Sequence, residues 1–300
     1  MNKRKGLNME QKRNLTGWAF LLPASILIFV FCFYPMVQAL ILSFQKGTGS
    51  AVQPAGFANY ARILKDATFQ QCLFNTIFYF VIQVPIMLIL ALILAQLLNS
   101  PDIKGKGIYR TMIFLPCATS LVSYSMIFKS LFANDGLVNR VLSTVGIPTV
   151  DWFQNAWAAR WVIVIALIWR WTGYNMVFYL AGLQNIDYSI YEAARIDGAG
   201  EFYTFNKIVL PIMKPALAVQ AIFSFVASWN NYFIPALVLD TADKKTLPIL
   251  IAQLRSADFL KFDMGKVYMM VAIAILPVIV VYLLLSKFIV RGVALGGVKG

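Results

Sequence analysis

The chain has 300 residues, of which 60% are hydrophobic and 13% are charged, and its formal net charge is +13. A soluble domain has about 25% charged residues and less apolar content, so this composition excludes an ordinary soluble enzyme and indicates a polytopic membrane protein. Lys and Arg in such proteins flank the apolar spans and face anionic lipid, so the positive charge does not indicate nucleic-acid binding.

The N-terminal residues 1–15 are polar and carry five Lys and Arg residues. The apolar run that follows is longer than the core of a signal peptide, and no clear small-x-small cleavage site follows it. We therefore predict a cytoplasmic N-terminal tail over 1–15, followed by a retained first span.

Six apolar blocks are long enough to cross a bilayer, which needs about 20 residues per helix. The six blocks are 18–44, 73–98, 108–132, 157–183, 215–239 and 267–290. The prediction is an all-α protein with six transmembrane helices within a membrane domain over 16–292, and a cytoplasmic C-terminal tail over 293–300.

The distribution of basic residues predicts the orientation in the membrane. With the N-terminus inside, the cluster of Lys104, Lys106 and Arg110 in the short second loop also falls inside, as positively charged short loops should. The cluster between Lys244 and Lys266 falls outside and argues weakly against this orientation.

The sequence lacks features that proton-driven transport or ATP binding needs. There is no histidine, and all thirteen Asp and Glu residues lie outside the cores of the six blocks. Proton-driven transporters usually place such groups within the membrane, and no GxxxxGK[ST] motif is present to bind ATP. We predict no metal, no cofactor and no catalytic site, and expect another chain to supply the energy for uphill transport; sodium coupling through backbone carbonyls stays open.

The stretch YEAARIDGAG, residues 191–200, is a polar island between the fourth and fifth blocks. Ser189 and Glu192 have the spacing of a capping box that starts a helix, and Asp197-Gly198 can end that helix. A second short helix is expected over about 201–209. The result is a helix-turn-helix on the inner face of the membrane, and without further evidence it could be a passive interfacial hairpin.

The order of residues in this loop resembles the cytoplasmic signature of the membrane subunits of ATP-binding-cassette importers. The signature comprises Glu192-Ala193-Ala194, Gly198 and Ile208-x-Leu210-Pro211, and ARIDGAGEFYTFNKIVLPIMKP is similar to the carbohydrate branch of that family. Other stretches also resemble sugar permeases, among them LLPASILIFVFCFYPMVQALILSF, NTIFYFV and LAGLQNI. Asp187 departs from the family, in which proline is common, although an Asp or Ser cap can start the helix equally well. SWNNYFIPALVL and GGVKG look more like the other partner of the usual permease pair.

The resemblance implies a function for the loop over 184–214, which we call the coupling loop. It would dock on a cytoplasmic ATPase subunit, with Glu192 facing that partner, Ala193 and Ala194 allowing close approach, and Gly198 setting the turn. Asp197, Leu210 and Pro211 belong to the same predicted coupling site. The implied partners are a second permease subunit, forming a heterodimer with this chain, two ATPase subunits that bind ATP-Mg, and an external sugar-binding protein.

The predicted substrate pathway centres on Arg170, a charge deep within the fourth block, because an intramembrane charge is by default a functional candidate. Aromatic faces and amide groups near it suit the C–H surfaces and hydroxyls of sugars. The predicted pathway residues are Trp169, Arg170, Tyr174 and Asn175 in the fourth block and Trp229, Asn230 and Asn231 in the fifth. Arg170 could instead be a structural pin that reaches backbone carbonyls.

The sequence thus favours a permease subunit of a sugar importer that works by alternating access. An ATPase-independent secondary transporter or channel is the alternative, and a membrane enzyme lacks any nucleophile–base pair or metal constellation. A monosaccharide, disaccharide, oligosaccharide or glycerol phosphate all remain open as substrate.

Overall fold

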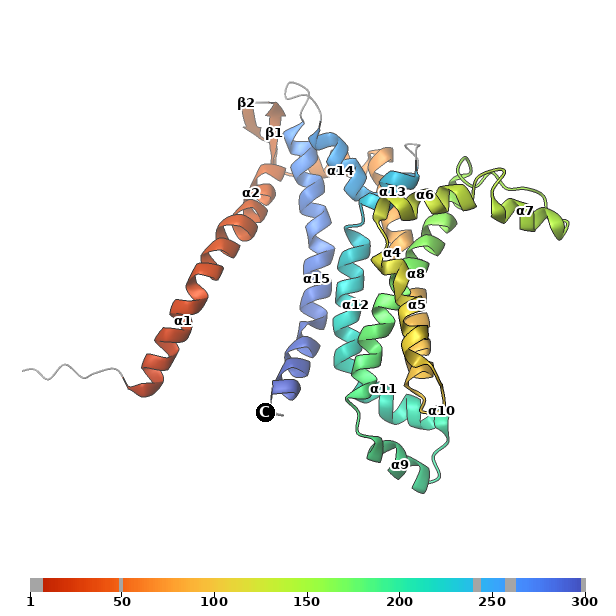
Figure 1. Ribbon diagram of the computed structural model, residues 1–300. Coiled ribbons are helices and arrows are strands. Elements are labelled where there is room, and N and C mark those ends of the chain that lie inside the picture. The colour runs from red at the N-terminus through yellow and green to blue at the C-terminus, as the bar shows by residue number, and fades with distance from the viewer. Residues whose placement is uncertain (1–7, 49–50, 240–243, 257–262, 298–300) are drawn as a thin grey trace, which may run out of the picture. The chain divides into compact units, whose positions relative to one another are not determined.

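The computed structural model describes residues 8–48, 51–239, 244–256 and 263–297, and most of its regular structure is helical (Figure 1). Among the described residues, five helical segments are long and apolar enough to cross a membrane, and a sixth qualifies only if a sharply bent pair is counted as one span. The prediction of an all-α polytopic protein is confirmed. The chain divides into two compact units, 1–64 with 254–275 and 65–253 with 276–300, which are described separately.

The first unit begins with a long helical segment made of α1 (Met9–Ile28), the π-helical turn η1 (Phe29–Phe33) and α2 (Tyr34–Ser43). A capping box starts α1, because the side chain of Asn8 accepts from the Met9 N–H at 2.7 Å and that of Gln11 accepts from the Asn8 N–H at 3.0 Å. The helix therefore begins within the predicted tail over 1–15, of which residues 1–7 lie outside the described part.

A small hairpin and the start of the last helix complete this unit. The elements are β1 (Gln45–Thr48), β2 (Ala51–Pro54), α3 (Ala58–Leu64) and the first turns of α15 (Met264–Gly297). Asn59 in α3 donates to the Gln45 carbonyl at 2.7 Å. A Cβ on Gly265 would lie 2.5 Å from the same oxygen, so the close approach of α15 requires glycine there.

The second unit is a helical bundle in which α8 packs along both α4 and α5 (Figure 1). Its elements are α4 (Ala67–Asn99), α5 (Lys106–Ala118), α6 (Leu121–Leu131), α7 (Leu137–Thr144), α8 (Ala156–Gln184), α9 (Tyr188–Ile196), α10 (Glu201–Thr204), η2 (Phe205–Val209), α11 (Leu210–Ile212), α12 (Lys214–Trp229), α13 (Phe233–Val238) and α14 (Leu247–Arg255). The core lies on α8, where Val162, Ile163 and Leu167 are buried.

The third predicted block, 108–132, is not one straight span. It breaks between α5 and α6, whose axes differ by 95°. Thr119 and Ser120 are extended at the break, with ψ of 149° and 139°. Pro116 lies in the last turn of α5, and its carbonyl accepts from the Thr119 hydroxyl at 2.7 Å, which helps to end the helix.

Two further boundaries differ from the prediction. The fifth block, 215–239, is interrupted after Trp229, and the chain resumes a helix only at Phe233. At the other end of the chain, α15 continues to Gly297 and takes up most of the predicted tail over 293–300, whose last three residues lie outside the described part.

Candidate functional site

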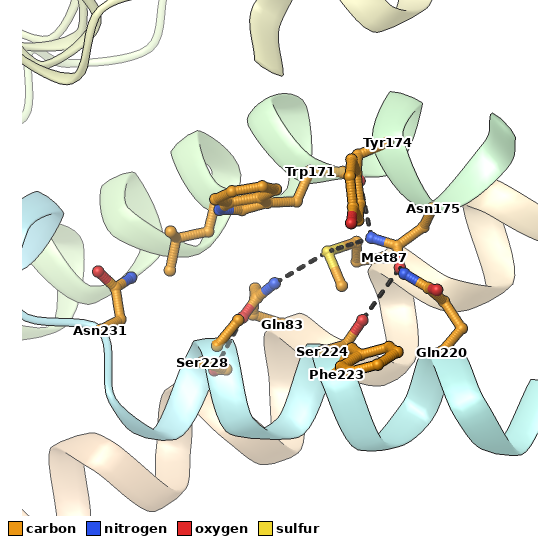
Figure 2. A pocket seen from close by; sticks show the side chains of 12 residues that line it. Gln83, Met87, Trp171, Tyr174, Asn175, Gln220, Phe223, Ser224, Ser228 and Asn231 are labelled. Carbon is orange, nitrogen blue, oxygen red and sulfur yellow. Dashed lines mark hydrogen bonds between the residues drawn. The ribbon is translucent and has the colours of Figure 1, made fainter. Parts of the chain in front are cut away.

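A cavity of about 310 Å³ lies within the second unit, between α4, α8 and α12 (Figure 2). Most of its exposed wall is apolar, and a few neutral polar side chains converge within it. The lining residues are Gln83, Met87, Leu167, Trp171, Tyr174, Asn175, Gln220, Phe223, Ser224, Ala227, Ser228 and Asn231. A concave site with a few convergent polar groups among apolar walls is typical of small-molecule binding.

Asn175 organises the polar side of this cavity. Its Oδ1 accepts from Gln220 Nε2 at 2.5 Å and from the Ser224 hydroxyl at 3.0 Å. Its Nδ2 donates to the Trp171 carbonyl at 2.7 Å. These bonds join α8 to α12 across the cavity, so the amide is held in one orientation.

A thioether sulfur stands among these amides. Met87 Sδ accepts from Gln83 Nε2 at 3.1 Å and from Asn175 Nδ2 at 3.5 Å, as the dashed lines in Figure 2 show. Sulfur is a weak hydrogen-bond acceptor. The two N–H groups therefore have partners that a better acceptor could replace.

The structure brings only part of the predicted substrate pathway together. Tyr174, Asn175 and Asn231 line the cavity. Trp169 does not, since it stacks on Tyr124 with ring centroids 5.8 Å apart and remains 45% exposed. The other three predicted residues, Arg170, Trp229 and Asn230, also lie outside the lining.

The sequence analysis missed several lining residues. Gln220, Ser224 and Ser228 recur at intervals of four in α12, so they share one helix face. This polar stripe in an apolar helix was a usable signal. Gln83 and Met87 show the same spacing in α4, but Met87 is apolar and gave no hint of a polar role.

Arg170 is buried and directed at the broken span. Its guanidinium donates to the carbonyls of Pro116 and Cys117, each at 3.2 Å, and to the Thr119 hydroxyl at 3.3 Å. Cations are favoured at the C-terminal end of a helix, where carbonyl groups lack helical partners. This geometry matches the structural-pin alternative, in which Arg170 closes the end of α5.

The coupling loop forms the expected helix-turn-helix, with a different start. The first helix, α9, is capped by Asp187, whose side chain accepts from the Ser189 N–H at 2.9 Å. The predicted capping box of Ser189 and Glu192 is therefore wrong, because an earlier acidic residue takes the cap position.

The predicted end of α9 at Asp197-Gly198 is confirmed. Gly198 has φ of +77°, the left-handed conformation that favours glycine. The Ala199 N–H donates to the Ala194 carbonyl at 2.9 Å and the Gly198 N–H to the Arg195 carbonyl at 3.1 Å. These two bonds form a Schellman motif, which turns the chain into α10.

The surface of the loop mixes charge with large apolar side chains. Glu192, Ala193, Asp197, Gly198 and Pro211 are exposed, Leu210 is half-buried, and Ala194 is buried. Ile196 is 86% and Phe202 83% exposed, so the loop presents two large apolar side chains as a candidate contact surface.

An ion pair ties the two helices of the loop together. Arg195 Nη2 lies 2.8 Å from Glu201 Oε1, and this hydrogen bond raises the pKa of Arg195 above its ordinary value. Burial raises the pKa of the neighbouring Tyr191. The pair connects α9 to α10 beyond the turn itself, but both side chains are solvent-exposed, so the turn at Gly198 sets the geometry of the loop more than the pair does.

Apolar helices around a cavity with a few convergent polar groups, with an exposed helix-turn-helix in the same unit, are the features of a membrane transport subunit. A family model described as "Binding-protein-dependent transport system inner membrane component" matches residues 68–294. The chain belongs to this family of permease subunits and is a multi-pass membrane protein.

Similar proteins agree with this assignment. The chain is 46% identical over 223 residues to the lactose transport system permease protein LacF of Rhizobium radiobacter, covering 74% of this chain and 75% of LacF. It is 34% identical over 222 residues to the arabinooligosaccharides transport system permease protein AraP of Halalkalibacterium halodurans, covering 73% and 70%.

A solved structure supports the fold. A chain of a bacterial ABC transporter that imports the acidic polysaccharide alginate superposes with a TM-score of 0.73 at 23% identity, covering 93% of this chain and 95% of that one. The same kind of transporter has been solved in complex with an alginate pentasaccharide-bound periplasmic protein, with a TM-score of 0.72.

Proposed function

We propose that this chain is one permease subunit of an ATP-driven sugar importer and that it carries part of the translocation pathway. The family describes a membrane component that works with a binding protein. The relatives named above are permeases of transport systems for lactose and for arabinooligosaccharides. The cavity offers amide groups and aromatic faces of the kind that bind sugars.

The exposed coupling loop is the observation that carries the ATP-driven mechanism. Its turn is fixed by Gly198, and the pair of Arg195 and Glu201 joins its helices. Glu192 and Phe202 are exposed on its surface. An exposed element with a defined turn and large apolar side chains suits docking on a second protein. We infer that two ATPase subunits and a second permease complete the transporter, and that ATP-driven closure of the ATPases moves the loop and alternates access to the cavity.

A pull-down with the ATPase subunit and an uptake assay with lactose and an arabinooligosaccharide, the sugars of the relatives named above, test this function. Glu192→Lys and Gly198→Leu should each reduce ATPase recovery and ATP-dependent uptake at least tenfold, because one reverses a charge and the other forces a side chain into a left-handed conformation. Glu10→Lys is the matched control, since Glu10 is exposed in α1 and lies outside the loop.

Two results would contradict the proposal. Retained ATPase and retained uptake in both loop variants would make the loop a passive hairpin. Sugar uptake by proteoliposomes that contain no ATPase would identify a secondary transporter or channel instead.

A further inference from the structure

We propose that the cavity between α4, α8 and α12 selects neutral sugar units against anionic ones, and that Gln83 and Asn175 donate hydrogen bonds to the sugar in place of Met87. This inference rests on the proposed function and names the substrate class of the same site.

The cavity wall has no charged side chain, and this disfavours anionic ligands. None of its twelve lining residues has an ionisable acid or base, apart from the phenol of Tyr174. An anion moved out of water into such a site needs a cation or several donors to offset its lost hydration. A carboxylate or phosphate would find no cation in this wall, whereas a hydroxyl needs none.

Arg170 does not alter this balance. It precedes Trp171, a lining residue, but its own guanidinium donates to Pro116, Cys117 and Thr119. Moving it into the cavity would leave the carbonyls at the end of α5 without this partner. Both terminal guanidinium nitrogens are therefore committed to the end of α5, the guanidinium lies 5.5 Å from the ring centroid of Trp171, and Arg170 is not among the residues that line the cavity.

Two amide N–H donors of the wall have a weaker partner than the amide acceptors have. The acceptor Asn175 Oδ1 already receives two donors, and Gln83 Oε1 receives the Ser228 hydroxyl at 3.1 Å. The N–H groups of Gln83 and Asn175 meet at the sulfur of Met87, a weak acceptor. A sugar hydroxyl oxygen is a better acceptor, so it replaces the sulfur with a net gain for both amides.

Aromatic rings supply the remaining contacts. Trp171 and Tyr174 are nearly perpendicular, at 84° with centroids 5.8 Å apart, and Phe223 lies on α12. Such faces pack on the C–H surfaces of a sugar ring. The volume of about 310 Å³ is at the lower end of the range for small-molecule sites, which suits a small sugar rather than a long chain.

Equilibrium binding to the assembled permease–ATPase complex in lipid nanodiscs, without the external binding protein, tests the inference. The probes are lactose and lactobionate, its oxidation product with one carboxylate; if the uptake assay identifies another neutral sugar, that sugar and its carboxylate derivative are used. The wild-type complex should bind the neutral sugar at least tenfold more tightly than the acid.

Two variants that each add one positive charge, one inside and one outside the cavity, test whether the cavity itself determines the selectivity. Asn231 lines the cavity, at the opposite end from Gln220 in Figure 2, whereas its neighbour Asn230 is exposed and lies outside the lining. Asn231→Lys should increase lactobionate binding about tenfold through the added cation. Asn230→Lys adds the same charge one residue away and should leave the selectivity unchanged.

Equal binding of the two sugars by the wild type, or equal effects of the two Lys variants, would overturn the inference while ATP-dependent uptake remains intact. If no sugar is taken up with ATP, the proposed function fails and the inference fails with it. Gln83→Leu, which removes one donor, should lower neutral-sugar affinity about tenfold, and unchanged affinity would overturn the assigned role of the amide.

Discussion

Arg170 donates to the carbonyl oxygens of Pro116 and Cys117, which belong to the last turn of α5, where carbonyls lack a helical partner. We expect Arg170→Met to lower the free energy of unfolding by about 1–3 kcal/mol, because it removes a buried, charge-assisted donor from the Cys117 carbonyl, while the Pro116 carbonyl keeps the Thr119 hydroxyl. Arg170→Lys should recover only part of the loss, since an ammonium lacks the planar fork of the guanidinium. Thermal unfolding of the detergent-purified complex measures both effects.

Arg140→Met is the control for this prediction. Arg140 is exposed, and its Nε donates to the Asp135 carbonyl at 2.9 Å in the α6–α7 connection. A solvated arginine contributes little to stability, so a change within about 0.5 kcal/mol is expected. If Arg170→Met unfolded like the wild type but lost sugar binding, Arg170 would belong to the substrate pathway.

At the scale of elements, α5 and α8 are held at close range by Gly173. A Cβ at this position would lie 2.0 Å from the Ile113 carbonyl oxygen, so Gly173→Ala must push the two helices apart. The expected loss is about 1–3 kcal/mol, the usual effect of overpacking, again measured by thermal unfolding. Gly182→Ala in the same helix is the control, because its Cβ would meet the flexible end of Met213 at 3.3 Å. Both substitutions gain the same helix propensity, so equal changes in stability would show that the close approach at Gly173 does not govern the packing of α5 on α8.

The helices were easier to predict from the sequence than the bend between two of them. Hydropathy located the apolar blocks because a bilayer sets the length of a span. It could not locate the 95° bend, which depends on the extended conformations of Thr119 and Ser120. Pro116 marked the region, but proline is common in membrane helices and does not by itself predict a break.

The cavity was only partly predictable for a related reason. Gln83, Asn175 and Gln220 lie far apart in the sequence and meet because α4, α8 and α12 pack together. Local patterns indicate which face of a helix is polar, but not which faces meet. The coupling loop was largely predictable, because Gly198 and the exposed acidic helix are local features.

At the scale of the whole molecule, the bent pair decides the sidedness of everything that follows it. If α5 and α6 together cross the bilayer, α7 lies on the same side of the membrane as the hairpin of β1 and β2, and α9 lies on the other side. If the pair is re-entrant, α7 and the hairpin lie on opposite sides. The basic residues Arg195, Lys207 and Lys214 of the coupling loop favour the crossing, since only the crossing places them in the cytoplasm when the N-terminus is cytoplasmic.

Labelling of single cysteines with a membrane-impermeant maleimide in intact cells distinguishes these arrangements. The background replaces Cys32, Cys72 and Cys117 with alanine, and the probes are Gln53→Cys in β2, Ser143→Cys in α7 and Ser189→Cys in α9, all at exposed positions. Because the positive-inside rule places the coupling loop in the cytoplasm, we expect Gln53→Cys and Ser143→Cys to react from outside and Ser189→Cys to react only after the cells are permeabilised. Labelling of Ser189→Cys in intact cells would show that the coupling loop lies outside the cytoplasm. A cytoplasmic ATPase could then not bind this loop and could not drive the permease by moving it.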